Sequence, residues 1–331
     1  MQFRTAELAD AVGGRLEGPD VVVDGASIDS RSLRPGQLFV PVVAERDGHD
    51  FVLAALEVGA AAYLTAREPV GGTAVVVDDT ATALTAAGAL ARGRLPEPVV
   101  GITGSVGKTS VKDLLGAALG RRLRTHVNER SLNNELGVPL TLLEAPEGTE
   151  AVVVEMGTRG AGHIADLCAV ARPTVGIVTR VDAAHTELLG TLEDVAHAKA
   201  ELVEALPPHG TAVLFAGDER VLAMADRTSA RVVPYGPGGE VRAEDVVVDD
   251  ELRPRFRLSS PWGHAEVRLL VHGLHQVDNA LGAAAAALEI GVPVEDVAAG
   301  LGDAVLSPWR MELATAPSGA RILNDAYNAN P

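Results

Sequence analysis

Short apolar runs alternate with amphipathic segments along the middle of the chain. Four runs of this kind are Val99–Ile102, Ala151–Val154, Val175–Val178 and Thr211–Phe215. In the segment that follows the first run, Val111 to Gly120, apolar residues recur every three or four positions. Short apolar runs are typical of buried strands, and the longer period is typical of helices. This alternation predicts an α/β domain with a mostly parallel sheet.

The first 97 residues show the same alternation with shorter elements. Helices are expected at residues 6–12, 51–59 and 82–92, and strands at residues 21–23, 38–40, 61–65 and 74–77. Pro96 and Pro98 then break the pattern. We therefore predict a small α/β domain over residues 1–97 and a second domain over residues 98–314.

The last third of the chain changes character. Residues 246–271 read as a β-ribbon around Pro261-Trp262-Gly263, and an alanine-rich helix follows at Ala280–Ile290. A final strand and a linker are expected within residues 315–331. The ribbon is thus predicted as an addition to the parallel-sheet domain.

Composition and charge limit the classes of partner. The 331 residues are 47% hydrophobic but only 3% aromatic, and the net charge is −17 with a pI of about 4.9. An acidic chain is poorly suited to nucleic acid or to anionic membrane as its main partner. The single cysteine, Cys168, excludes an internal disulfide, and no apolar run approaches the ~18 residues of a membrane span. A cytoplasmic protein without a membrane span is expected.

A glycine-rich turn follows the first of the central strands. The sequence runs Thr103-Gly104-Ser105-Val106-Gly107-Lys108-Thr109-Ser110 and leads into the predicted helix. Such a turn lets backbone N–H groups surround a phosphate, with Lys on the phosphate oxygens and the Thr hydroxyl on Mg²⁺. The pattern is shorter than the usual one, because Ile102 stands where that pattern has its first glycine. An ordinary strand–helix turn gives no reason for Lys and Thr directly after a glycine, so we predict nucleotide binding.

Other polar residues follow the ends of neighbouring strands. Glu155 ends the run of valines that begins at Val152, and His185 follows the next strand. Taken alone, a carboxylate or histidine at a strand end is more often a surface or structural group, and Lys199 alone reads as a solvated helix residue. Because ligands of open α/β sheets bind beyond the carboxyl ends of the strands, Glu155 beside a phosphate loop is predicted as a Mg²⁺ ligand.

These motifs, taken in order along the chain, resemble those of one enzyme family. They are Gly101–Thr109, Leu132–Leu140, Glu155–Gly157, Ala184–His185, Ala198–Glu201, Gly273–Ala280, Arg310–Glu312 and Asp325–Pro331, with Asp29–Arg31 and Asp47–Asp50 in the first block. The chain resembles the ATP-dependent Mur ligases of peptidoglycan assembly, and within them the branch that adds D-alanyl-D-alanine. The resemblance covers essentially the whole chain.

The resemblance implies a role for each candidate residue. It places the uridine diphosphate of the substrate near Ser27, Ser30, Arg31, Asp47, Gly48 and His49. It assigns ATP to Gly104, Ser105, Gly107, Lys108, Thr109 and Ser110, with His275 and Asn279 near adenine, Arg310 near phosphates or ribose and Asp325 near ribose. Two Mg²⁺ sites would use Thr109, Glu155, His185 and Lys199, the last at a position that several Mur ligases carbamylate. Lys108, Asn134, His185 and Lys199 are the catalytic candidates.

The activity implied is the ATP-dependent joining of D-Ala-D-Ala to UDP-MurNAc-tripeptide through an acyl phosphate, by a monomer. Such ligases have a third, Rossmann-like C-terminal domain, and this sequence stops at Pro331, where that domain is expected to begin. Two alternatives stay open: a related ligase for another carboxylate and amine, or a nucleotide-binding protein without catalysis.

Overall fold

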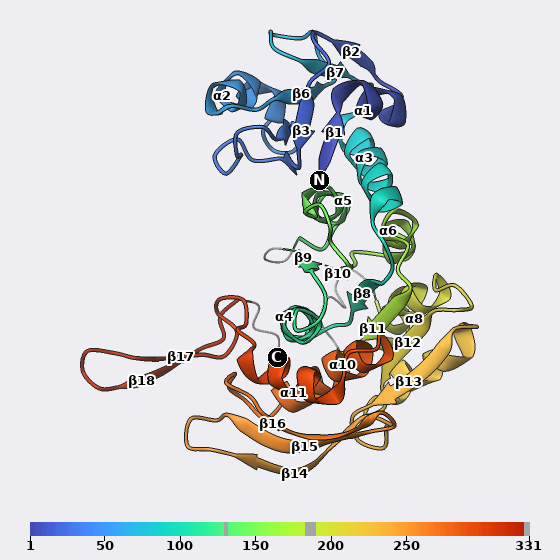
Figure 1. Cartoon of the computed structure of the whole chain (residues 1–331), viewed down its shortest axis with the longest axis vertical. Helices are drawn as coiled ribbons and strands as arrows, with labels where there is room; N and C mark the ends of the chain where they lie inside the picture. The colour runs from blue at the N-terminus through green and yellow to red at the C-terminus, as the bar shows by residue number, and fades with distance from the viewer. Residues whose placement is uncertain (129–131, 183–189, 328–331) are drawn as a thin grey trace. The chain divides into compact units, whose positions relative to one another are not determined.

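The computed structural model describes residues 1–128, 132–182 and 190–327, and it divides into two compact units (Figure 1). The first unit consists of Met1–Leu95 together with Leu132–Thr149. The second unit consists of Pro96–Ser131 and Glu150–Pro331. Each unit is described by itself below.

The first unit is built on a five-stranded sheet with the order β2-β7-β6-β5-β4. Strands β4 to β7 run parallel, and β2 pairs with β7 in the antiparallel sense. The strands are β2 (Arg15–Glu17), β4 (Ala26–Ser27), β5 (Leu38–Phe39), β6 (Ala62–Thr65) and β7 (Ala74–Val76), while β1 (Gln2–Arg4) and β3 (Val22–Asp24) form a separate antiparallel pair. The helices before residue 96 are α1 (Thr5–Val12), η1 (Gly48–Phe51), α2 (Val52–Val58) and α3 (Thr80–Arg94).

A fifth helix of the first unit, α5 (Gly137–Glu144), comes from later in the chain. Almost all of it is buried, and it packs against α3. A Cβ at Gly88 would lie 2.6 Å from the Cβ of Pro139, so the close approach of the two helices requires glycine there. The compact units therefore differ from the predicted division, which placed residues 132–149 within a domain of residues 98–314.

The second unit contains a six-stranded, fully parallel sheet with the order β13-β12-β11-β8-β10-β9. The strands are β8 (Val99–Thr103), β9 (Thr125–Val127), β10 (Ala151–Glu155), β11 (Val175–Val178), β12 (Thr211–Phe215) and β13 (Arg231–Tyr235). Every residue of β8, β10, β11 and β12 is buried, which explains their continuous apolar sequences. The predicted parallel α/β fold is confirmed.

Helices cover both faces of this sheet (Figure 1). On one face, α4 (Lys108–Leu119) packs against α10 (Gln276–Glu289) and α11 (Val294–Asp303). On the other face, α6 (His163–Ala171) packs against α8 (Leu192–Glu204), and short helices α9 (Glu219–Leu222) and η2 (Ala223–Arg227) follow β12. A capping box between Thr191 and Asp194 fixes the start of α8.

The predicted ribbon around Pro261-Trp262-Gly263 is present as the antiparallel pair β15 (Pro254–Ser260) and β16 (Gly263–Arg268), and β14 (Arg242–Val248) extends it to a three-stranded antiparallel sheet. The sequence pattern missed β14 because a bulge between Glu244 and Val247 interrupts its alternation and most of the strand is exposed. A hairpin of β17 (Glu312–Thr315) and β18 (Arg321–Asn324) ends the described chain.

Among the helices in the described part of the chain, none is both long and apolar enough to cross a bilayer.

Candidate active site

The glycine-rich turn lies between β8, the fourth strand of the sheet order, and the start of α4. Gly104 and Gly107 have φ values of +146° and +87°. A Cβ at Gly104 would lie 1.8 Å from the Thr179 hydroxyl, and one at Gly107 would lie 2.5 Å from Oδ1 of Asn279. Both positions therefore need glycine, for their backbone conformation and for the close approach of a neighbouring side chain.

The turn is fixed to the end of β11 by hydrogen bonds. The Ser105 N–H donates to the Arg180 carbonyl at 2.7 Å, and the Ser105 hydroxyl donates to the Asp182 carbonyl at 3.0 Å. The Thr179 hydroxyl donates to the Val106 carbonyl at 2.6 Å. The loop is thus held in shape by protein groups alone, as a site that binds phosphate without rearrangement must be.

Three cationic side chains gather around this loop. Lys108 Nζ donates to the loop's own carbonyls, Gly104 O at 2.8 Å and Ser105 O at 3.4 Å. Burial lowers the pKa of Lys108, the nearby Glu155 carboxylate opposes this shift, and the Arg310 charge adds to it. Burial and then the Lys108 charge lower the pKa of Lys199 to about 7. Mutual repulsion in a buried place is relieved by an anion, which makes this loop suited to a polyphosphate.

Arg310 supplies the most direct indication of an anion site. One of its terminal nitrogens donates to the Thr109 hydroxyl at 3.1 Å, and its guanidinium lies 4.3 Å from the centre of the Tyr327 ring. Its Nε is the one buried side-chain nitrogen or oxygen without a hydrogen-bond partner among the described residues. A buried donor of a charged group seldom stays unpaired, so this N–H is placed for an acceptor that none of the described residues provides.

The described metal candidates fit a hard cation only in part. The Thr109 hydroxyl donates to Glu155 at 2.9 Å, and both residues are buried, so two oxygens meet beside the loop. The Glu155 N–H is in turn held by the Asn128 side chain at 3.2 Å. No group of three or more His, Cys, Asp or Glu residues gathers for a metal within the described ranges, and His185 lies outside them. Two oxygens beside phosphate oxygens suit Mg²⁺, which keeps much of its water.

Lys199 is 3% exposed and lies within helix α8. As an ammonium it cannot be a metal ligand. Burial lowers the pKa of the amine to about 7, which favours the uncharged state that can react with carbon dioxide to form a carbamate.

The residues assigned to adenine and ribose lie at the start of α10 and after β18. Asn279 reaches Gly107, as described above, and its amide donates to the Gln276 side chain at 2.8 Å. Burial lowers the pKa of His275, and the Asp325 carboxylate opposes the shift, so the two side chains are near enough to interact. Asp325 also accepts from the Met311 N–H at 3.1 Å, next to Arg310. The structure thus brings Asn279 to the loop and His275 near Asp325.

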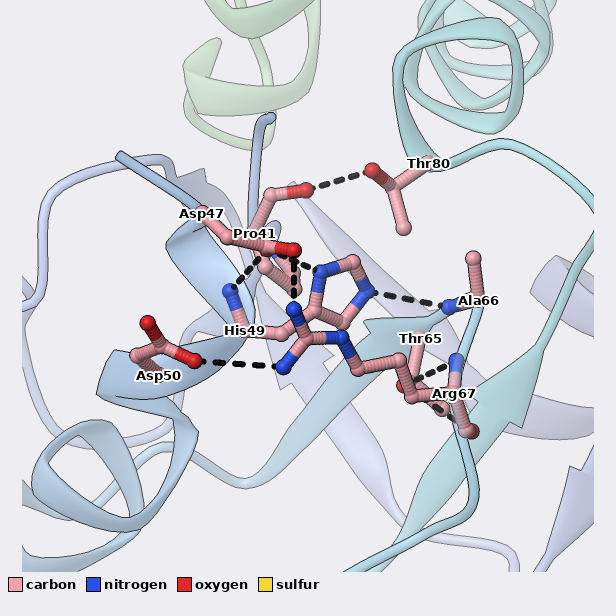
Figure 2. Close-up of polar contacts among 8 residues, drawn as sticks. All are labelled: Pro41, Asp47, His49, Asp50, Thr65, Ala66, Arg67 and Thr80. Atoms are coloured by element: carbon pink, nitrogen blue, oxygen red, sulfur yellow. Dashed lines mark hydrogen bonds and ion pairs between the residues drawn. The ribbon is translucent and has the colours of Figure 1, made fainter. Parts of the chain in front are cut away.

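The Asp47–His49 turn of the first unit forms a closed network (Figure 2). The Asp47 carboxylate accepts from the His49 N–H at 2.9 Å and contacts His49 Nδ1 at 2.6 Å. His49 Nε2 accepts from the Ala66 N–H at 3.0 Å, so Nδ1 carries the proton of the neutral ring. Arg67 pairs with the second oxygen of Asp47 and with Asp50 at 3.1 Å. Both ring nitrogens of His49 are therefore used within the protein.

Gly48 fits this turn closely. Its N–H donates to the Val42 carbonyl at 2.9 Å, and a Cβ at Gly48 would lie 2.5 Å from the Val42 nitrogen. No larger residue can occupy that place without a backbone shift.

The Ser27–Arg31 segment begins at the last residue of β4. The Ser27 hydroxyl donates to the Asp29 carbonyl at 3.0 Å, and the Arg31 guanidinium pairs with the Asp29 carboxylate at 2.7 Å. The hydrogen bonds from Arg31 lower the pKa of Asp29 to about 2. Arg31 is 87% exposed, and Ser30 stands between the paired residues. Unlike the His49 ring, the Arg31 head can reach a ligand from solvent.

Asn134 belongs to the first unit, whereas the phosphate loop belongs to the second. Its side-chain oxygen accepts from the Gly137 N–H at 2.9 Å and the Leu136 N–H at 3.3 Å, which holds the first turn of α5. The predicted place of Asn134 near the terminal phosphate stays a prediction.

Sequence reasoning missed several residues that support these sites. Arg180 pairs with Asp278 on α10 and lies 4.5 Å from the centre of the Phe215 ring. Lys112 is buried and donates to the Asn128 carbonyl at 2.9 Å. Lys112 could have been predicted from the sequence, because it lies one turn after Lys108 on α4. The roles of Arg67 and Arg180 could not, because their contacts depend on how the strands are arranged.

Comparisons with known proteins agree with these features. The Mur ligase middle domain model matches residues 102–287. The UDP-N-acetylmuramoyl-tripeptide–D-alanyl-D-alanine ligase of Mycobacterium bovis is 41% identical across 100% of this chain, which spans 72% of that protein. The Bacillus subtilis protein of the same name is 36% identical over 98% of this chain and 72% of its own length.

Solved structures give the same result. The structure of MurF from Acinetobacter baumannii matches 100% of this chain and 74% of its own with a TM-score of 0.91 at 30% identity. MurF from Thermotoga maritima, solved in complex with ADP, matches 93% of this chain and 72% of its own with a TM-score of 0.78 at 28% identity. The chain belongs to the Mur ligase family.

Proposed function

We propose that this protein is an ATP-dependent ligase that joins D-Ala-D-Ala to UDP-MurNAc-tripeptide. The observation that carries the nucleotide part is the unpaired Arg310 Nε beside Thr109 and the phosphate loop. The substrate part rests on relatives that are named for this activity and that match essentially the whole chain. We also propose that the protein acts in the cytoplasm as a monomer.

The reaction needs a carboxylate to become an acyl donor. ATP phosphorylates the terminal carboxylate of the tripeptide to give an acyl phosphate, and the free amine of D-Ala-D-Ala attacks it with release of phosphate. Lys108, whose amine lies beside the loop carbonyls, is proposed to bind the phosphate oxygens and neutralise their charge. Gly104, Ser105, Gly107 and Ser110 would present backbone N–H groups, and Asn134 would approach the terminal phosphate.

Mg²⁺ would be held by Thr109 and Glu155 beside the phosphates, with His185 and Lys199 proposed for a second ion. When bound, Mg²⁺ supplies charge neutralisation on the transferred phosphoryl group. Lys199 can serve there only as a carbamate, because its ammonium would repel the cation. Arg310 would bind phosphate or ribose, Asp325 ribose, and His275 and Asn279 adenine.

The UDP part of the substrate is proposed to bind to the first unit. Arg31, being exposed, would meet the diphosphate, with Ser27 and Ser30 beside it. The Asp47–Gly48–His49 turn would bind through its backbone and its shape, because both ring nitrogens of His49 are engaged.

The test is ADP release by the protein expressed from its complete reading frame. ADP should appear only when ATP, UDP-MurNAc-tripeptide and D-Ala-D-Ala are all present, and Lys108→Ala should stop it. Turnover with a different carboxylate and amine would reassign the substrates, and nucleotide binding without any turnover would contradict the ligase.

A further inference from the structure

Helix α5 joins two segments that the proposed function assigns to different substrates. Asn134 holds its first turn through the Leu136 and Gly137 N–H groups. Glu144 is its last residue. Strand β4, which the Glu144 side chain contacts, carries Ser27 of the proposed UDP-substrate segment.

Glu144 makes an unusually complete set of contacts with the first unit. One carboxylate oxygen accepts from the Ala26 N–H at 2.7 Å and from Gln37 Nε2 at 2.7 Å, and the other pairs with Arg34. A Cβ at Gly25 would lie 2.2 Å from that first oxygen, so Gly25 leaves the room that the carboxylate occupies. These contacts join residue 144 to residues 26–37, which are more than a hundred positions away in the sequence.

The partners of Glu144 are themselves fixed. Gln37 is 3% exposed, and its other side-chain atom accepts from the Arg34 N–H at 2.6 Å. Only 23% of the Glu144 side chain is exposed. Charge-assisted hydrogen bonds in such a place are stronger than those of an exposed ion pair.

The helix between Asn134 and Glu144 is short and firmly packed. Residues 137–143 are buried, and Pro139 lies against Gly88 of α3. Eight helical residues span about 12 Å, and one buried segment of that length transmits a displacement at one end to the other.

We propose that Glu144 is a positioning residue of the ligation reaction, one that fixes the Asn134 segment to strand β4 so that Asn134 and the UDP-substrate residues are held as one piece. This rests on the proposed function. Asn134 is accordingly placed by the substrate-binding unit rather than by the phosphate loop, so correct seating of the UDP substrate and correct placement of Asn134 depend on each other.

The kinetic test is a double-mutant cycle of Glu144→Ala and Asn134→Ala in the complete protein. Each single variant should lower kcat by about 10-fold or more while the Kd for ADP changes less than about 2-fold, and the double variant should be no worse than the poorer single variant within about 3-fold. Multiplying effects, or a rise in the KM for UDP-MurNAc-tripeptide with unchanged kcat, would overturn the proposal.

Matched variants separate positioning from loss of folding. Glu147→Ala removes an exposed glutamate three residues further on and should leave kcat unchanged. Glu144→Gln keeps the side-chain shape and one acceptor and should retain an intermediate kcat. If Glu144→Ala does not fold, Glu144→Gln takes its place in the double-mutant cycle.

A second readout is independent of catalysis. Amide exchange at Leu136 and Gly137 should be faster in Glu144→Gln than in the wild type, and unchanged in Glu147→Ala. Unchanged exchange in Glu144→Gln overturns the proposal even in a protein that ligates. Faster exchange in a protein that never releases ADP contradicts the proposed function and supports the mechanical link.

Discussion

Two polar loops of this chain differ in how far their charged and polar side chains are paired within the protein. At the phosphate loop, the Lys108 amine reaches only loop carbonyls and Arg310 Nε has no partner among the described residues. At the Asp47–His49 turn, both carboxylate oxygens and both ring nitrogens are paired within the protein. Unsatisfied buried donors indicate a ligand site, and fully satisfied groups indicate a scaffold. The following predictions test this difference.

The largest effect is expected at Lys108. Replacing Lys108 by Ala removes the charge that neutralises the transferred phosphate, so kcat should fall by about 10³-fold or more. ADP release at saturating substrates measures it. A Lys112→Met variant is the comparison, because Lys112 donates to the Asn128 carbonyl and its loss should act mainly on stability. Equal turnover by Lys108→Ala and the wild type would contradict the loop assignment.

Arg310→Met should weaken nucleotide binding with less effect on folding. The lost hydrogen bonds to a charged ligand are worth about 1.5–3 kcal/mol, so the Kd for ADP should rise about 10- to 100-fold. Titration calorimetry gives the value. An unchanged Kd would mean that the unpaired Nε faces no phosphate or ribose.

Lys199→Met should abolish turnover yet stabilise the ligand-free protein. The folded-state pKa of about 7 lies below the ordinary 10.5, so between these values the unfolded chain binds more protons and stability rises with pH. The variant loses that dependence, and its advantage should be about 1–3 kcal/mol at pH 6 and fade toward pH 10. Urea unfolding at several pH values tests this, and a variant less stable at pH 6 would contradict the buried-charge account.

His49→Ala should destabilise the first unit by about 1–3 kcal/mol, because it leaves the Ala66 N–H unpaired and removes the ring's contact with Asp47, whose oxygen keeps only the residue-49 N–H. The Kd for UDP-MurNAc-tripeptide should rise through loss of the turn's shape, and the Kd for ADP should not change. His49→Gln, whose side-chain oxygen can accept from Ala66, should recover part of both losses. Full substrate affinity in a destabilised His49→Ala would separate this turn from the substrate site.

Arg31→Ala is expected to have the smallest effect on folding. An ion pair this exposed is screened by solvent and adds little to stability, so thermal unfolding should hardly change. A rise in the Kd for UDP-MurNAc-tripeptide would therefore report a direct contact. If that Kd is unchanged, the diphosphate lies elsewhere.

The local features of the fold were predictable from sequence, and the distant contacts were not. The strand, turn and helix from Val99 to Leu119 follow from apolar spacing and glycine placement, which act within a few residues. The packing of α5 on α3 depends on the close contact between Gly88 and Pro139, and no sequence pattern near either residue predicts that contact.

The same limit applies to the candidate sites. His49 was assigned to substrate on resemblance, but its tautomer is set by the Ala66 N–H after β6, seventeen residues away in sequence. The unpaired state of Arg310 Nε could not be predicted from the sequence, because the Arg310 guanidinium lies between Thr109 and Tyr327, which are far apart in the chain. His185 lies outside the described residues, so its predicted role in metal binding stays a prediction.

The most direct test of the contrast between the two loops is calorimetry on wild type and Lys108→Ala, with ADP plus Mg²⁺ and with UDP-MurNAc-tripeptide as separate titrants. We predict that the variant loses ADP binding and keeps the wild-type Kd for UDP-MurNAc-tripeptide. Unchanged ADP binding in the variant would contradict the account, because the phosphate loop would then not be the nucleotide site.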